Sequence, residues 1–459
     1  MAIPGGAFFI FDLFRVNASS MTMPFQRWFY LLASVVTVQS TKAQAVDVVR
    51  GPYLQVVTPT SITIRWRTSQ PTESRVQFGT FATRLNQEVS DLKAVTDHEV
   101  ILTNLKPATR YYYAFGSSKT TMNVDPEQHF QTSPKPGSTD PIRIWALGDF
   151  GNSSATQLGC RDAIVNATKD RRPDVWLWLG DNAYSNGLED EFQQHVFGVY
   201  QDGFFRNMPF WATPGNHDYG GQIESQAIPY FQICSMPRQG EAGGVPSGSE
   251  SYYSFDYGNV HFVSLDSYGK MDGGQRIYDT TGRQVDWLKR DLAANKQPWT
   301  IVFFHHPPYT KGSHDSDTEE LLVNIRQNLL PVLERYNVDL VLGGHSHVYE
   351  RTYPIVGHYG LADTFDPKHI VVASNSDQPN EYRVNGKKQG IIYIVAGSGG
   401  QLGGQESGWP LKAAAYTNNT EGGSMLIDVK DNRLEARWVC TDGVVRDRFS
   451  IVKEKQGIR

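Results

Sequence analysis

From residue 142 onward, short and almost wholly apolar segments alternate with stretches of helical periodicity. Segments of this kind have no polar face, so each must be covered on both sides, and the alternation predicts a sheet flanked by helices. Further strands after about residue 390 would complete a second sheet. The segments that set this pattern are "IRIWALGD" (142–149), "DVWLWLGD" (174–181), "PFWATPGNHD" (209–218), "WTIVFFHHPP" (299–308) and "VDLVLGGHSH" (338–347).

A different pattern precedes this region. Between residues 51 and 132, apolar and polar residues alternate with period two, and in "SITIRWRTS" the side chains of Ile62, Ile64 and Trp66 share one face. The tyrosines of "LKPATRYYY" resemble the late-strand signature of fibronectin type III domains. We therefore predict an all-β sandwich over residues 46–133, which acts as a spacer or helps to shape the substrate site.

The two patterns meet at "TSPKPGSTDP" (132–141), a stretch rich in proline, glycine and serine. This composition predicts a linker at 134–141 and a second domain at 142–455. A chain of 459 residues is also longer than a single domain usually is.

The first 45 residues are predicted to be a leader segment. Arg27 precedes the apolar run "WFYLLASVVTV", and "AQA" (43–45) follows it, which is the order of a secretory signal. The run is about half of the ~20 residues that a membrane span needs. We expect no membrane span, and export to the periplasm or the extracellular space after cleavage near Ala45.

Composition argues against two classes of function. A formal net charge of −5 offers no basic surface for nucleic acid. Three cysteines, Cys160, Cys234 and Cys440, are too few for a disulfide scaffold, although one bridge stays open. No Cys-x-x-Cys pair occurs, so a thiolate zinc site is not expected.

The apolar segments end in residues that bind metals. Because the carboxyl ends of the strands in such a sheet meet at one edge, these side chains are expected to converge, and the neighbouring glycines permit sharp turns. Their oxygen and imidazole donors suit iron, zinc or manganese, and they are too many for one tetrahedral ion. Two ions bridged by an aspartate would together use all of these donors. The candidates are Asp149, Asp181, Tyr184, Asn216, His305, His345 and His347.

The order of these motifs resembles that of the calcineurin-like metallophosphoesterases, and the tyrosine of GDxxY resembles the purple acid phosphatase branch. The resemblance covers residues 46–455 and implies an α+β or α/β protein, in which a four-layer αββα domain with a dinuclear centre follows the sandwich. The motifs are "GDFG" (148–151), "GDNAY" (180–184), "GNHD" (215–218), "VFFH" (302–305) and "GHSH" (344–347).

The resemblance also implies the ligands and the reaction. A ferric ion and a divalent ion (zinc, iron or manganese) would serve an acid phosphatase that cleaves small phosphomonoesters, in which a metal-bound hydroxide attacks phosphorus in line. Such relatives often form homodimers. Carried over motif by motif, the ligands are Asp149, Tyr184 and His347 for the ferric ion, Asn216, His305 and His345 for the divalent ion, and Asp181 as the bridge.

Two further histidines resemble the substrate-binding histidines of the family. His217 follows Asn216 directly, and His314 lies on the loop after His305, so either is a candidate catalytic proton donor. Some relatives carry a second histidine where this chain has Asp315, which leaves the donor and the pH optimum open. Asp218 is expected to orient His217, and His306 to point away from its neighbour, because side chains alternate along an extended backbone.

Two other functions compete with the phosphomonoesterase. A phosphodiesterase or nucleotide hydrolase would use the same metals, and only the substrate pocket would differ. A binding protein with a vestigial metal site would lack some of the ligands, and none is missing here. The sequence does not identify the natural substrate, the divalent metal or the oligomeric state.

Overall fold

The computed structural model describes residues 46–454, except 124, 271–272, 372–377 and 385–389. The predicted leader and its cleavage position near Ala45 lie outside the described residues. Within the described part of the chain, no helix combines the length and the apolarity that a bilayer crossing needs.

The N-terminal domain is a β-sandwich, as predicted, and it is built around one long strand. Its first part, Thr63–Thr68, pairs with β1, and its second part, Arg75–Gly79, pairs with β4, so the strand connects the two. Ile62, Ile64 and Trp66 are buried, as the alternation predicted. The strands are β1 (Val48–Gln55), β2 (Ile62–Gly79), β3 (Gln87–Leu102), β4 (Arg110–Gly116), β5 (Thr121–Asn123) and β6 (His129–Gln131). The narrower fibronectin type III assignment stays a prediction.

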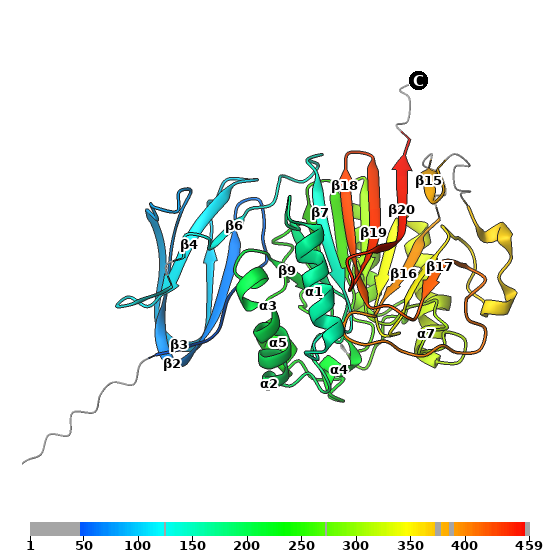
Figure 1. Ribbon diagram of the computed structural model, residues 1–459, viewed down its shortest axis with the longest axis horizontal. Coiled ribbons are helices and arrows are strands. Elements are labelled where there is room, and N and C mark those ends of the chain that lie inside the picture. Colours follow the sequence, from blue (N-terminus) through cyan, green and yellow to red (C-terminus); the bar gives the residue numbers. More distant parts are fainter. Residues whose placement is uncertain (1–45, 124, 271–272, 372–377, 385–389, 455–459) are drawn as a thin grey trace, which may run out of the picture. The chain divides into compact units, whose positions relative to one another are not determined.

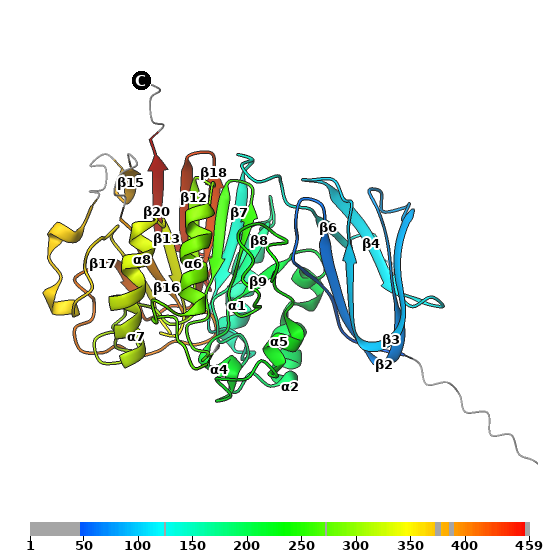
Figure 2. The ribbon, with the colours of Figure 1, turned by 180° about the vertical axis from the view of Figure 1, so that it is seen from behind.

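Two seven-stranded sheets form the second part of the chain (Figures 1 and 2). The first runs in the order β15 (Glu381–Val384), β20 (Val445–Lys453), β19 (Arg433–Cys440), β18 (Gly423–Lys430), β7 (Ile142–Leu147), β8 (Val175–Trp178) and β9 (Phe210–Ala212). The second runs in the order β10 (Tyr253–Tyr257), β11 (Val260–Ser264), β12 (Trp299–Phe303), β13 (Leu340–Gly343), β16 (Ile392–Ala396), β14 (Tyr349–Thr352) and β17 (Ala414–Asn418).

Helices cover the outer faces of the two sheets, which gives the predicted αββα layers. In Figure 1, α1 (Ala155–Ala167) lies in front of β7 and β18. Figure 2 shows α6 (Arg283–Ala294) and α8 (Leu330–Arg335) over β12 and β13 on the opposite side. Residues 320–335 form one helical stretch, made of α7 (Glu320–Asn324), a π turn (Ile325–Leu329) and α8.

The strands after residue 390 do not form a sheet of their own. Strand β16 joins the second sheet beside β13, whereas β18 pairs with β7 and brings β19 and β20 into the first. The parallel strands β7, β8 and β9 therefore lie inside a mixed sheet, and their carboxyl ends point to the same edge as those of β12 and β13.

The helical segment after β8 packs on the sandwich. It comprises α2 (Glu189–Glu191), a π turn (Phe192–Phe197), α3 (Gly198–Tyr200) and a second π turn (Gln201–Phe205), and it is followed by the short helices α4 (Asn216–Tyr219) and α5 (Pro229–Ile233). The hydroxyl of Tyr113 donates to the Arg206 carbonyl at 2.9 Å. The backbone N–H of Gly51 donates to Gln201 Oε1 at 3.1 Å. No regular element lies between β6 and β7, and the domain limits at 133 and 142 stay predictions.

Candidate metal centre

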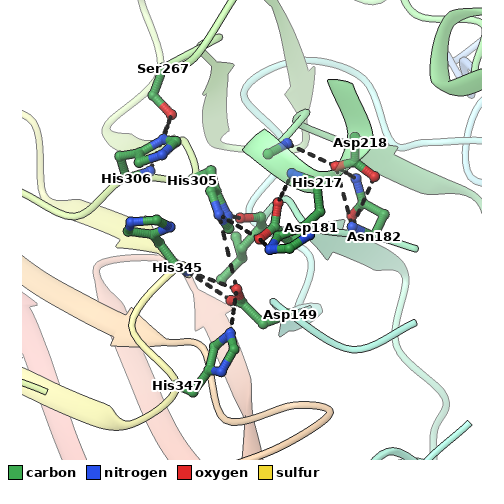
Figure 3. Close-up of polar contacts among 12 residues, drawn as sticks. Asp149, Asp181, Asn182, His217, Asp218, Ser267, His305, His306, His345 and His347 are labelled. Atoms are coloured by element: carbon green, nitrogen blue, oxygen red, sulfur yellow. Dashed lines mark hydrogen bonds and ion pairs between the residues drawn. The ribbon is translucent and has the colours of Figure 1, made fainter. Parts of the chain in front are cut away.

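The predicted site residues follow strands of both sheets. Asp149 lies two residues beyond β7 and Asp181 three beyond β8, while His305 and His345 each lie two residues beyond β12 and β13. Asp149, Asp181 and His345 have left-handed backbone conformations, with φ of 57°, 49° and 68°. Such conformations are costly for residues other than glycine and concentrate at functional sites. The turns after the strands therefore direct these side chains to one place (Figure 3).

Four of the candidates form a tight cluster. The Tyr184 hydroxyl lies 3.1 Å from Asp149 Oδ1, 3.3 Å from Asp181 Oδ2 and 3.3 Å from His347 Nε2. His347 Nε2 is itself 3.5 Å from Asp149 Oδ1. The side-chain Nε2 of Gln401 lies 3.0 Å from the other ring nitrogen of His347, Nδ1, and so fixes the orientation of the ring.

Two buried polar atoms among the candidates have no hydrogen-bond partner in the described residues: His305 Nε2 and the amide oxygen Asn216 Oδ1. His305 Nδ1 lies 2.9 Å from the Leu179 carbonyl, to which it donates, so Nε2 is the nitrogen left for an ion, and it lies 3.2 Å from Asp181 Oδ2. Buried polar atoms are normally paired, so these two atoms are available to coordinate an ion.

His345 contacts the cluster through its backbone and a glutamate through its ring. Its N–H donates to Asp149 Oδ1 and Oδ2 at 3.0 and 2.9 Å. Its Nε2 lies 3.6 Å from Glu319 Oε2, which leaves Nδ1 as the nitrogen available to an ion. A carboxylate on the far nitrogen of a metal-binding histidine is a common arrangement.

The two predicted catalytic histidines flank the cluster. The His217 ring is partly exposed, its Nδ1 lies 2.6 Å from the Ser185 carbonyl, and its Nε2 lies 3.8 Å from Asp181 Oδ2. His314 stacks on His345 with ring centres 3.7 Å apart, and its Nδ1 lies 2.9 Å from Glu319 Oε1. Both rings therefore keep Nε2 for a substrate.

Two family models match the chain. The calcineurin-like phosphoesterase model matches residues 142–349, and the model of the purple acid phosphatase N-terminal domain matches residues 49–132. The chain belongs to the purple acid phosphatase family. Together the two matches span well over half of the 459 residues and include every candidate ligand.

Named relatives agree with this membership. Purple acid phosphatase 23 of Arabidopsis thaliana is 30% identical over 315 residues, which are 63% of each chain. Acid phosphatase type 7 of Danio rerio is 26% identical over 436 residues, which are 86% of this chain and 89% of that one. The chain spans 63%, 64% and 58% of the length of the Arabidopsis purple acid phosphatases 23, 15 and 18.

Solved structures share the fold. Purple acid phosphatase PPD1 of yellow lupin (Lupinus luteus) superposes with a TM-score of 0.68 at 21% identity, over 88% of this chain and 74% of that one. PhoD gives a TM-score of 0.61 at 13% identity, over 89% of this chain and 90% of that one.

Close backbone packing supports the ligands of this purple acid phosphatase family member. A Cβ on Gly215 would lie 2.1 Å from Asp181 Oδ1, and one on Gly344 would lie 2.3 Å from Asp149 Oδ2. Gly180, with φ of +88°, has His305 Nδ1 2.5 Å from the place of a Cβ. Only glycine fits these three positions, which explains the GD, GN and GH pairs of the motifs.

The charges of the site favour a cation. Burial by itself would lower the pKa of His305, but the carboxylates of Asp181 and Asp149 raise it to about 9. Burial, together with the same two carboxylates, raises the pKa of the Tyr184 phenol well above 10. The phenol thus keeps its proton unless a strongly polarising cation lies beside it. Oxygen and imidazole donors, two of them unpaired, fit the metals that the family implies.

Sequence reasoning missed three neighbours of the site. Glu319 contacts both His314 and His345, yet no spacing rule marks it. Ser267 lies 2.8 Å from His306 Nδ1, and Gln401 contacts His347 from the glycine-rich loop that follows β16. His306 does not point away: its ring centre lies 4.8 Å from that of His305 and 4.2 Å from that of His345.

Asp218 has a different role from the predicted one. Its carboxylate accepts from the Asn182 side chain at 2.9 Å and from the Gly215 N–H at 2.8 Å (Figure 3). Asp218 therefore connects the turn after β8 to the turn after β9. The ring of His217 is instead oriented by its contact with the Ser185 carbonyl. Asp218 thus stabilises the turns that carry the candidate ligands, whereas the missed neighbours contact histidine rings.

All three cysteines, Cys160, Cys234 and Cys440, are buried and free, so the bridge left open by the sequence is not present.

Proposed function

We propose that the protein is an exported acid phosphatase that cleaves small phosphomonoesters at a pair of metal ions, one ferric and one divalent (zinc, iron or manganese). The convergence of two buried carboxylates, a tyrosine and three histidines from both sheets supports this function, and the unpaired Asn216 Oδ1 and His305 Nε2 are the observation that carries it. Membership in the purple acid phosphatase family supports the same reaction class.

Each ligand has a proposed ion. Asp149, Tyr184 and His347 lie together and would hold the ferric ion, because a phenolate suits Fe(III). Asn216, His305 and His345 would hold the divalent ion, and Asp181, whose Oδ2 contacts both His305 and Tyr184, would bridge the two ions. When bound, the two ions would offset the charge of the phosphate oxygens and lower the pKa of a coordinated water.

The histidines at the rim would bind the substrate and move the proton. His217 is held by the Ser185 carbonyl with Nε2 toward the cluster, where it can donate to a phosphate oxygen. Glu319 accepts from His314 Nδ1 and leaves Nε2 without a partner from that residue, so we assign the proton for the leaving oxygen to His314 Nε2. Asp315 is bound by the Lys311 ammonium and is therefore not the donor.

A metal analysis with a visible spectrum and two substrates tests this function. The purified chain is expected to contain iron, to show a broad visible absorption band, and to hydrolyse a nitrophenyl phosphate monoester faster than the bis(nitrophenyl) diester. Faster diester hydrolysis would favour the phosphodiesterase. A colourless protein with two zinc or two manganese ions would overturn the ferric assignment and the role of Tyr184.

A further inference from the structure

A buried arginine of the sandwich contacts the segment that follows Tyr184. The Arg50 side chain on β1 is only 2% exposed. Its Nε donates to Gln193 Oε1 at 3.0 Å, and a terminal nitrogen pairs with Glu189 Oε1. The guanidinium also lies 4.8 Å from the Phe197 ring centre. All three partners belong to the helical segment between β8 and β9, so one buried cation attaches that segment to the sandwich.

The start of the same segment is tied to the loop beside the site. Glu191, two residues after Glu189, accepts the backbone N–H groups of Asn186 and Leu188 at 2.9 Å each, and that of Ser185 as well. Burial favours the neutral acid, but these hydrogen bonds hold the pKa of Glu191 below its usual value, so it accepts as a carboxylate. The loop and the first turn of the helical segment therefore move together.

The other end of the loop carries two site residues. Tyr184 precedes Ser185 directly, and the Ser185 carbonyl orients His217 by its contact of 2.6 Å with Nδ1. The rings of Tyr184 and His217 have centres 4.7 Å apart. The loop has little slack, because a Cβ on Gly187 would lie 2.6 Å from Asp218 Cα. A displacement of the loop would thus shift both rings.

We propose that Arg50 is a positioning residue for Tyr184 and His217, so that the sandwich supports the site and is more than a spacer. This role rests on the phosphatase function proposed above. Leaving the buried Arg50 guanidinium without its partner would be costly. The pair therefore restrains Glu189, and with it the start of the helical segment. Arg50 acts through Glu189, Glu191 and the Ser185 carbonyl, and touches no candidate ligand itself.

The test compares two sandwich arginines. Arg50→Met keeps the bulk of the side chain and removes the donors. Arg65→Met is the matched control, since Arg65 is also buried but donates to the carbonyls of Ile233 and Gln232, at 2.6 and 2.7 Å, away from the site loop. In Arg50→Met, kcat on nitrophenyl phosphate is expected to fall by about tenfold or more with a smaller change in KM, because small misplacements of reacting groups are that costly.

A second readout does not depend on turnover. Backbone amide hydrogen exchange over residues 184–193 is expected to become faster in Arg50→Met and to stay unchanged in Arg65→Met. In a His217→Ala background, Arg50→Met is expected to lower kcat by a smaller factor, since one of the groups that it positions is absent. Arg50→Lys should recover part of kcat by restoring the charge.

Three results would overturn the role of Arg50. They are unchanged exchange and kcat in Arg50→Met, equal effects of the two arginine variants, or full additivity with His217→Ala. If Arg50→Met does not fold, Glu189→Gln breaks the same contact from its half-exposed side and is expected to change exchange and kcat in the same direction. A wild-type chain without phosphatase activity would refute the proposed function, while the exchange comparison would still decide whether Arg50 holds the loop.

Discussion

Asp149 and Asp181 are almost fully buried, and no lysine or arginine in the described ranges pairs with either. Buried carboxylates without such partners are unfavourable unless cations neutralise them. Their neighbours are histidines, whose charge varies with pH and is given up when they bind a metal. At the scale of single residues, the charges and donors of the site are therefore compatible with bound cations.

Replacing Asp181 by asparagine tests its role as the bridge. Asp181→Asn keeps the size of the side chain but removes the negative charge between the two proposed ions. Loss of an outer partner of a metal ligand already lowers activity by up to about 10²-fold, so loss of the bridge itself is expected to lower kcat/KM by more than about 10²-fold. Metal content, measured on the purified chain, should fall below two ions. Asp162→Asn, an exposed aspartate on α1, is the control and should change neither. Normal turnover in Asp181→Asn would refute the bridge.

The convergence of the candidate ligands could be predicted because each follows a strand in a short motif, whereas the residues that contact them could not. Glu319 reaches His314 from five residues away, and Gln401 reaches His347 from 54 residues away, so neither has a fixed local spacing. The orientation of His306 was mispredicted because β12 ends at Phe303, and the alternation of an extended strand no longer applies two residues later.

At the scale of elements, the turns after the strands determine the site. Gly344→Ala is expected to displace the Asp149 carboxylate, since a Cβ there would lie 2.3 Å from Oδ2. We predict lower metal content and a loss of kcat/KM of at least about tenfold, with the fold retained by circular dichroism. Gly404→Ala is the control from the nearby glycine-rich loop, because nothing lies within 4 Å of its Cβ position. Equal behaviour of the two variants would contradict this role for the turn.

Another contact between two elements of secondary structure lies away from the site. His261 on β11 is buried between two carboxylates, with Nδ1 2.8 Å from Asp256 Oδ1 on β10 and Nε2 2.8 Å from Asp291 Oδ2 on α6. Burial would lower its pKa, but these two partners raise it to about 9. The protonated ring therefore joins a strand to the helix that covers it.

The stability that this contact adds depends on pH. Because the folded pKa lies above the unfolded value of about 6.5, the contribution is fully present below pH 6.5 and is lost as the pH rises through 9. In urea, the free energy of unfolding should be higher for wild type than for His261→Gln. This difference should be larger at pH 6 than above pH 9, by as much as about 3 kcal/mol. A difference that does not change with pH would show that the ring is not held as a cation.

The strand and helix types were largely predictable from apolar periodicity, but the sheet order was not. Strands β18, β19 and β20 follow one another near the C-terminal end of the sequence. In the structure, however, β18 pairs with β7, some 280 residues earlier. Which distant strand becomes a neighbour depends on how the buried faces fit, and alternation within one strand carries no information on its partner.

At the scale of the whole molecule, the two sheets share one buried ion pair. Arg351 on β14 of the second sheet donates to Asp447 on β20 of the first, Nε to Oδ2 at 2.6 Å and a terminal nitrogen to Oδ1 at 2.9 Å. Both side chains are at most 2% exposed. The Tyr349 hydroxyl donates to the same carboxylate at 2.9 Å.

Breaking this pair from one side should cost more than removing it. Arg351→Met leaves Asp447 buried with a single neutral donor, so the free energy of unfolding is expected to fall by about 3–5 kcal/mol in urea. Arg351→Met with Asp447→Leu removes both charges and should recover part of that loss, although the Tyr349 hydroxyl then lacks its partner, which costs about 1–3 kcal/mol. A double variant less stable than Arg351→Met would show that the pair itself holds the sheets together. Because neither residue contacts the site, metal content should stay the same in all three proteins, which separates the attachment of the sheets from the assembly of the metal centre.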